Sequence, residues 1–210
     1  MPVETELKLR IRDGETDFSI YADKAVVSGR MEQWRDIEMR SEYYDTPERD
    51  LLSRGWTLRL RHEDGEPVVA FKQKGFQESF LFFREEWQTP AASVEEALPI
   101  LASRGAPAEL LDFSGFSGCC TVNFTRRVTK LTLSDGSIVE LALDSGEINA
   151  GGASQLFHEL EMELLAGEPD RMVELGLEWE RDYGLEREPD SKYARALKMM
   201  EESGATPCDD

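Results

Sequence analysis

The chain carries two carboxylates and one ammonium at alternate positions near its start, in the segment VETELKLR at residues 3–10. Successive side chains of an extended strand point to opposite faces, so Glu4, Glu6 and Lys8 share one face and Leu7 and Leu9 the other. Carboxylate oxygens are hard ligands that suit Mg²⁺ or Mn²⁺, and an ammonium attracts anions. The pattern therefore predicts a strand whose polar face either meets water or lines a cavity that holds a metal and an anion.

Cations recur at the same spacing in the later segments. Arg59 and Arg61 alternate with Leu58 and Leu60 in GWTLRLRHED at residues 55–64. Three further segments carry cations in the same way, and these contribute Lys72 and Lys74, then Arg84, then Arg126 or its neighbour Arg127. Alternation does not say which of the two adjacent arginines points inward, and we favour Arg126. Turn signals such as EDGEP and SDG separate the segments, which predicts many antiparallel strands.

Carboxylates alternate in the second half of the chain. The segment SIVELALDSGE at residues 137–147 places Glu140 and Asp144 on one face. The segment FHELEMELLAGE at residues 157–168 aligns Glu159, Glu161 and Glu163. Three carboxylates in one row repel each other unless water or cations separate them. The row therefore suggests cation binding, although any one such row is also typical of a sheet face in water.

The number of polar rows favours a cavity over a solvated surface. Most of the predicted strands carry cations or carboxylates at every second position, and closing such a sheet would place them in one lumen. Helices are few: the patterns predict them at residues 93–105, 168–184 and 191–204, outside the sheet. Ser93 followed by Glu96 is a capping-box signal for the first of these.

Length and composition indicate a single domain. With 210 residues, 40% of them hydrophobic, the chain can bury one sizeable core. We assign residues 1–203 to that domain and residues 204–210 to an acidic, mobile tail. No apolar run approaches the roughly 18 residues of a membrane helix, and the first residues do not resemble a signal peptide, so we expect a cytoplasmic protein.

The net charge limits the possible partners. The formal charge of −19 argues against nucleic acid or an anionic membrane surface. Surface charges are screened over about 8 Å at physiological salt, so a basic cavity can still bind a small polyanion inside an acidic protein.

The order of these motifs along the chain resembles the CYTH superfamily, also called triphosphate tunnel metalloenzymes. Glu4, Glu6 and Lys8 match its ExExK signature. The motifs that follow in family order are YYDTPERDLLSRGWTLRLR, the lysine strand at Lys72, Arg84 with Glu86, FTRR, LALDSGEI, ELEMEL and SKYARAL. The resemblance extends from about residue 3 to residue 198.

The resemblance implies an α+β fold, an eight-stranded antiparallel β-barrel that forms a triphosphate tunnel with helices packed outside it. It assigns catalysis to Glu4, Glu6, Lys8, Lys72 and Arg126. It assigns triphosphate binding to Lys8, Arg59, Arg61, Lys72, Arg84, Arg126 and Lys192. It assigns Mg²⁺ or Mn²⁺ binding to Glu4, Glu6, Asp144, Glu159, Glu161 and Glu163, leaving open which two of the last three glutamates form the family's pair.

The expected activity is hydrolysis of inorganic triphosphate to pyrophosphate and phosphate by in-line attack of water, because the last segments most resemble bacterial inorganic triphosphatases. The alternatives are hydrolysis of thiamine triphosphate or a nucleoside triphosphate, a class IV adenylyl cyclase, and a non-catalytic sensor of polyphosphate or nucleotide. We expect a stand-alone CYTH domain without the helical CHAD domain that often follows it. We also expect a monomer or homodimer whose partner is a small triphosphate.

Overall fold

The computed structural model describes residues 3–11, 30–78 and 81–204. The strands are β1 (Val3–Arg10), β2 (Arg30–Met31), β3 (Arg35–Asp45), β4 (Thr57–Glu63), β5 (Glu66–Lys72), β6 (Phe76–Glu78), β7 (Leu81–Pro90), β8 (Ser117–Thr132), β9 (Ile138–Ala150), β10 (Ala153–Ala166) and β11 (Glu186–Arg187). The helices are α2 (Asp50–Arg54), α3 (Val94–Ser103), the 3₁₀ helix η1 (Ala108–Asp112), α4 (Asp170–Tyr183) and α5 (Lys192–Ser203).

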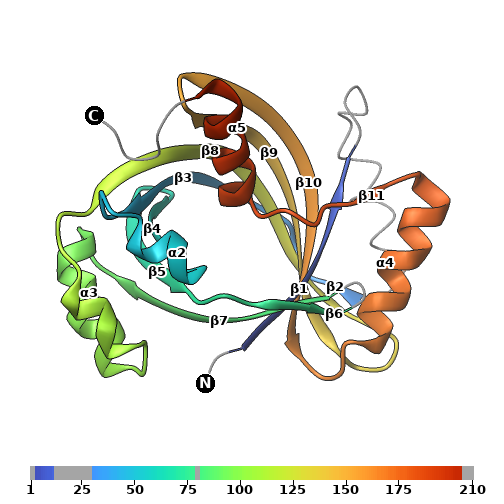
Figure 1. The fold of residues 1–210 in the computed structure, drawn as a ribbon. Helices are drawn as coiled ribbons and strands as arrows, with labels where there is room; N and C mark the ends of the chain where they lie inside the picture. Colours follow the sequence, from blue (N-terminus) through green and yellow to red (C-terminus); the bar gives the residue numbers. More distant parts are fainter. Residues whose placement is uncertain (1–2, 12–29, 79–80, 205–210) are drawn as a thin grey trace.

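Eight of these strands close into an antiparallel barrel. Their order is β1-β10-β9-β8-β3-β4-β5-β7, and β7 pairs again with β1 (Figure 1). The short strands β2, β6 and β11 extend the same sheet from its side. The expected eight-stranded barrel is confirmed, and the α-helices of the described residues lie outside the closed ring.

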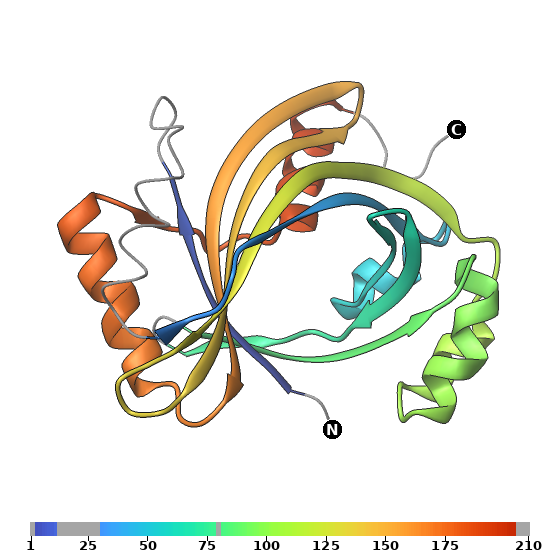
Figure 2. The same cartoon turned by 180° about the vertical axis from the view of Figure 1, so that it is seen from behind.

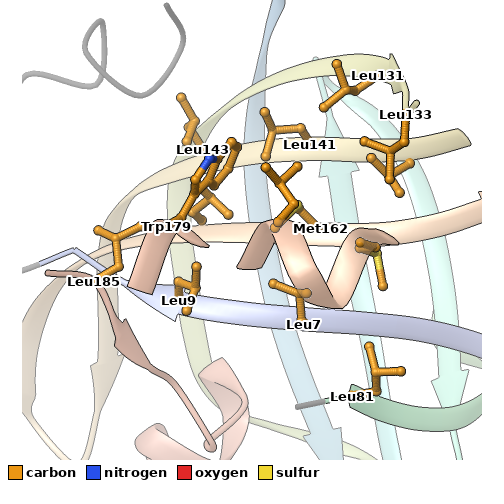
Figure 3. Close-up of a cluster of buried hydrophobic side chains, with 14 of the residues drawn as sticks. Leu7, Leu9, Leu81, Leu131, Leu133, Leu141, Leu143, Met162, Trp179 and Leu185 are labelled. Atoms are coloured by element: carbon orange, nitrogen blue, oxygen red, sulfur yellow. The ribbon is translucent and has the colours of Figure 1, made fainter. Parts of the chain in front are cut away.

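Helix α4 covers the outer face of β1, β10 and β9. Leu7 and Leu9 are fully buried there, and they pack with Leu141, Met162 and Trp179 (Figure 3). Because this outer face is apolar and covered, the opposite side chains of β1 must point into the barrel. The polar row of the opening segment is therefore the inner row, and Glu6 and Lys8 are buried without being part of an apolar core.

The other helices close different parts of the barrel. Helix α3 packs its apolar face on β5 and β7, where Phe71 and Trp87 are buried. Ser93 caps α3 by accepting the Glu96 N–H at 3.3 Å, as the capping-box signal predicts. Helix α5 packs against the long strands β8, β9 and β10, beneath the arch that they form (Figures 1 and 2). Its Tyr193 stacks on Tyr43 of β3, with the ring centroids 5.0 Å apart, which closes α5 over one end of the barrel.

Some predictions of the sequence differ in extent or fall outside the described residues. The helix expected at 168–184 occupies Asp170–Tyr183, and the one expected at 191–204 occupies Lys192–Ser203. The tail assigned to residues 204–210 lies outside the described residues except for Gly204. No helix in the described ranges combines the length and apolar character needed to cross a membrane.

Gly146 marks a point of close backbone approach on β9. A Cβ atom there would lie 2.1 Å from the Asn123 carbonyl oxygen and 2.5 Å from the Phe124 Cα. Neither backbone atom can move away alone. We expect Gly146→Ala to lower the free energy of unfolding by about 1–3 kcal/mol, the usual cost of overpacking, measured by urea denaturation. An unchanged midpoint would contradict this packing of β8 on β9.

Candidate functional site

A polar tunnel runs through the barrel and encloses a cavity of about 350 Å³. Its wall combines eight cations with seven carboxylates. The cations are Lys8, Arg35, Arg59, Arg61, Lys72, Arg84, Arg126 and Lys192, and the carboxylates are Glu4, Glu6, Glu63, Glu86, Glu140, Glu161 and Glu163. The tunnel therefore brings together all seven cations predicted to bind triphosphate, from elements that are far apart in the sequence.

One group of charges, which we call the β1 cluster, joins β1 to β4, β5 and β7: Glu4, Glu6, Arg59, Lys72, Arg84 and Glu86. The Lys72 ammonium donates to both Glu4 oxygens, at 3.0 and 2.8 Å, and lies 3.0 Å from Glu86. The Arg84 guanidinium donates to Glu6 at 2.9 Å. The cluster follows from strand register, because Glu4 lies opposite Arg84 and Lys72 lies opposite Glu86.

The opposite charges of the β1 cluster stabilise each other's ionised forms although the groups are buried. Burial opposes ionisation of Glu86, but Lys72 and Arg59 outweigh it and lower the Glu86 pKa to about 2. Burial likewise opposes the charge on Lys72, and Glu86 and Glu4 outweigh it and raise the Lys72 pKa. Lys72 therefore stays protonated at neutral pH, which is the form that binds an anion.

A second group, the β10 cluster, joins β8, β9 and β10 to α5: Arg126, Asp144, Glu159, Glu161, Lys192 and Arg195. Arg126 forms a bidentate pair with Asp144, at 2.8 and 2.7 Å, and also donates to Glu161 at 2.5 Å. Lys192 donates to Asp144 at 2.8 Å and to Glu161 at 2.9 Å, and it contacts Glu159. The first residue of α5 is thus bound directly to the barrel wall.

Three carboxylates of the β10 cluster are arranged as a possible cation site. One oxygen from each of Asp144, Glu159 and Glu161 lies within 4.8 Å of the others. Asp144 and Glu159 have almost no exposed surface, and Lys192 touches all three residues. Among the described residues, this is the one group that meets that distance criterion for histidine, cysteine and acidic side chains.

Glu163 occupies a different place from the other two glutamates of its row. Its register partner on β1 is Glu6, whereas Glu159 lies opposite Asp144 on β9. Burial, with repulsion from Glu4, raises the Glu163 pKa to about 7. The six residues predicted to hold metal therefore fall into two groups. Of Asp144, Glu159 and Glu161, only Glu161 lines the tunnel, whereas Glu4, Glu6 and Glu163 all line it.

The two adjacent arginines of β8 face opposite ways. Arg126 lines the tunnel, whereas Arg127 is 43% exposed and lies 3.8 Å from Asp36 on the outside. Arg10 is also outside the tunnel lining and pairs with Glu186 at 2.5 Å.

Sequence reasoning left several tunnel residues out of the site. Glu86 and Glu140 share the alternation of Arg84 and Asp144, which was a sufficient signal to include them. Glu63 likewise continues the alternation of Arg59 and Arg61. Arg35 begins β3, and Ile37 and Met39 follow it on the same face, so alternation gave no signal for it. Tyr43 and Tyr193 line the cavity as a stacked pair, and nothing in either local sequence points to the other ring.

Asp45 in the YYDTP motif has a structural role. Its buried carboxylate accepts from three backbone N–H groups, of Thr46 at 2.8 Å, Leu51 at 2.9 Å and Leu52 at 2.9 Å. These bonds fix the five-residue helix α2, which leads directly into β4 and its tunnel arginines. The motif therefore orients β4 through backbone contacts.

A closed antiparallel barrel with a charged tunnel through its centre defines a β-tunnel protein. The model of the CYTH domain matches residues 2–197, so the chain belongs to the CYTH domain family. A curated relative, the inorganic triphosphatase of Haemophilus influenzae, is 30% identical over 183 residues. That match covers 85% of this chain and 50% of the relative, so the chain spans about half the length of that protein.

Solved structures show the same fold at lower identity. A Hippeastrum protein, described as a candidate adenylyl cyclase with a dominant triphosphatase activity, superposes with a TM-score of 0.60 at 20% identity, covering 97% of both chains. A protein from Pyrococcus horikoshii OT3 gives a TM-score of 0.56 at 23% identity, covering 93% of this chain and 99% of that one. At these identities the likeness concerns the fold alone.

Proposed function

We propose that this protein is a divalent-metal-dependent triphosphatase that hydrolyses inorganic triphosphate to pyrophosphate and phosphate. The observation that carries the proposal is the enclosed tunnel in which eight cations and seven carboxylates face one small cavity. A cavity that only bound an anion would gain little from so many carboxylates. The relative named as an inorganic triphosphatase supports the choice of substrate.

The charge balance of the tunnel supports a requirement for metal. With every group ionised, eight cations and seven carboxylates leave little net positive charge. A triphosphate carries about four negative charges, and a buried anion requires comparable positive charge nearby. Mg²⁺ or Mn²⁺ fits the oxygen donors of Asp144, Glu159 and Glu161, and we propose Glu4, Glu6 and Glu163 as a second set. A bound ion would polarise phosphate oxygens and balance their charge.

The cations of the chain would hold and orient the phosphates. Arg59, Arg84 and Arg126 can each offer a planar fork to phosphate oxygens, and Lys8, Lys72 and Lys192 supply compact charges. Held in this way by several walls at once, the triphosphate would have one end fixed for in-line attack by water. Positioning and charge stabilisation account for most catalysis of this kind.

The side chains around the cavity support direct attack by water rather than a covalent intermediate. Ser191 is the one serine among the cavity-lining residues in the described part of the chain, and its oxygen accepts the Ala194 N–H at 3.1 Å as the cap of α5. Within the same lining there is neither cysteine nor histidine. The cavity lining of the described residues therefore offers no serine or cysteine nucleophile activated by a histidine.

A substrate panel tests the proposal. Purified protein is incubated with Mg²⁺ or Mn²⁺ and either triphosphate, thiamine triphosphate, ATP or longer polyphosphate, and both phosphate and cAMP are measured. We expect triphosphate to be hydrolysed fastest. We expect excess EDTA to abolish phosphate release, because no divalent ion would then polarise the phosphate oxygens and balance their charge. Conversion of ATP to cAMP with no reaction of triphosphate would contradict the proposal and favour a cyclase.

A further inference from the structure

Arg195 on α5 contacts a carboxylate of the possible cation site from outside the tunnel. It lies three residues after Lys192, so the two side chains share one face of the helix. Its guanidinium donates to the Glu159 Oε2 atom at 2.6 Å. Arg195 lines a second cavity together with Phe157 and Glu188, whereas Lys192 and Glu161 line the tunnel. Arg195 and Lys192 therefore approach Glu159 from two different cavities.

Glu188 connects the same guanidinium to β1. The Glu188 carboxylate lies 3.7 Å from Arg195, and the residue is only 5% exposed. The Glu188 N–H donates to the Lys8 carbonyl at 3.1 Å, and its side chain accepts the Asp190 N–H at 3.1 Å. Glu188 is therefore fixed to the strand that carries Glu4, Glu6 and Lys8.

The two oxygens of Glu159 consequently have different surroundings. Oε2 is bound by Arg195, and the centroid of the Phe157 ring lies 5.1 Å from the same guanidinium. Oε1 is contacted by Lys192, which also binds Asp144 and Glu161. Because Arg195 holds Oε2, the Oε1 atom of Glu159 is left directed at the carboxylates of Asp144 and Glu161.

We propose that Arg195, anchored by Glu188, is a positioning residue that orients Glu159 so that one carboxylate oxygen faces a divalent cation shared with Asp144 and Glu161. This inference rests on the metal-dependent function proposed above. Groups that hold metal ligands from behind fix the ligand's orientation, and losing one typically weakens metal binding by about 10- to 100-fold. Removal of a nearby positive charge would by itself strengthen metal binding. The direction of the change in affinity therefore distinguishes a loss of ligand orientation from a loss of charge.

The test measures Mn²⁺ binding to the substrate-free full chain by electron paramagnetic resonance. We expect Arg195→Met to raise the Mn²⁺ dissociation constant about tenfold or more, and Glu188→Gln to raise it less, since Arg195 would still hold Glu159. We expect the Mn²⁺ dissociation constant of Arg195→Lys to lie between those of wild type and Arg195→Met. An ammonium can replace one contact of the guanidinium but cannot present two donors in a plane. With triphosphate, Arg195→Met should need more Mg²⁺ for half-maximal rate and keep its kcat at saturating Mg²⁺.

Lys198→Met is the matched control. Lys198 lies on the same helix and pairs with Asp190 at 2.5 Å, next to Glu188, but it is 60% exposed and does not touch the site. It should bind Mn²⁺ as wild type does. Circular dichroism establishes that each variant is folded, and Glu188→Gln decides the question if Arg195→Met does not fold.

Three results would overturn the inference. Unchanged Mn²⁺ affinity in folded Arg195→Met, or in Glu188→Gln if only that variant folds, would reduce the pair to a structural role. Tighter Mn²⁺ binding would show that Arg195 acts only as an opposing charge. Failure of the wild-type protein to bind Mn²⁺ would overturn the metal assignment itself, and the substrate panel would show separately whether triphosphate is hydrolysed without metal.

Discussion

Replacing Glu4 by Gln is expected to lower kcat for triphosphate hydrolysis by about 100-fold or more while triphosphate binding stays within a few-fold of wild type. The substitution keeps the side-chain volume and removes one negative charge from the β1 cluster. Loss of a group that stabilises the charge of a transition state typically costs about 10²–10³ in kcat. Binding should persist because Lys72 retains Glu86 at 3.0 Å and the cations are unchanged.

Glu85→Gln is the control for this prediction. Glu85 lies on β7 beside Arg84 and faces away from the tunnel, and it is absent from the cavity lining. We expect its kcat to match wild type. Phosphate release at saturating Mg²⁺ measures turnover, and calorimetry with triphosphate measures binding. Unchanged turnover in Glu4→Gln would remove the metal role assigned to Glu4 and would favour a non-catalytic phosphate sensor.

Replacing Arg126 by Gln is expected to lower the free energy of unfolding by about 3 kcal/mol, because it leaves buried carboxylates without their partner. Asp144 is 0% exposed and forms its bidentate pair with Arg126. Removing one member of a buried ion pair typically costs about 3–5 kcal/mol, and the lower value applies because Lys192 still contacts Asp144. A chain of this size should then unfold about 6–12 °C lower.

Arg127→Gln provides a control that differs by one position. Arg127 is 43% exposed and lies 3.8 Å from an exposed Asp36, so its loss should change stability by less than about 1 kcal/mol. Thermal unfolding of both variants measures the difference, and phosphate release should fall only in Arg126→Gln. Equal destabilisation of the two variants would contradict the inward position of Arg126.

Alternation along each strand was sufficient to identify most of the tunnel residues. The pattern of VETELKLR separates Glu4, Glu6 and Lys8 from Leu7 and Leu9 because strand geometry has a period of two. The same local rule groups Arg59 with Arg61. It reached only the residues on regular strands: the five-residue helix α2, held by Asp45, is too short for a periodic signal.

Register and closure decided what the sequence left open. Arg126 and Arg127 are both compatible with the alternation of β8, and the pairing of Arg126 with Asp144 on β9 distinguishes them. The three glutamates of β10 look alike in sequence, but Glu159 lies opposite Asp144 and Glu163 lies opposite Glu6. Contacts between strands are set by the whole sheet, and no short segment encodes them.

The sequence by itself determined which side chains share a face, and the tertiary structure decided that this face encloses the tunnel. Helix α4 covers Leu7 and Leu9, and pairing of β1 with β7 closes the ring around the polar side. The physical reason is that side-chain alternation is a property of one extended segment. Which face becomes the interior depends on where remote helices bury apolar surface and on the strand pairing that closes the barrel.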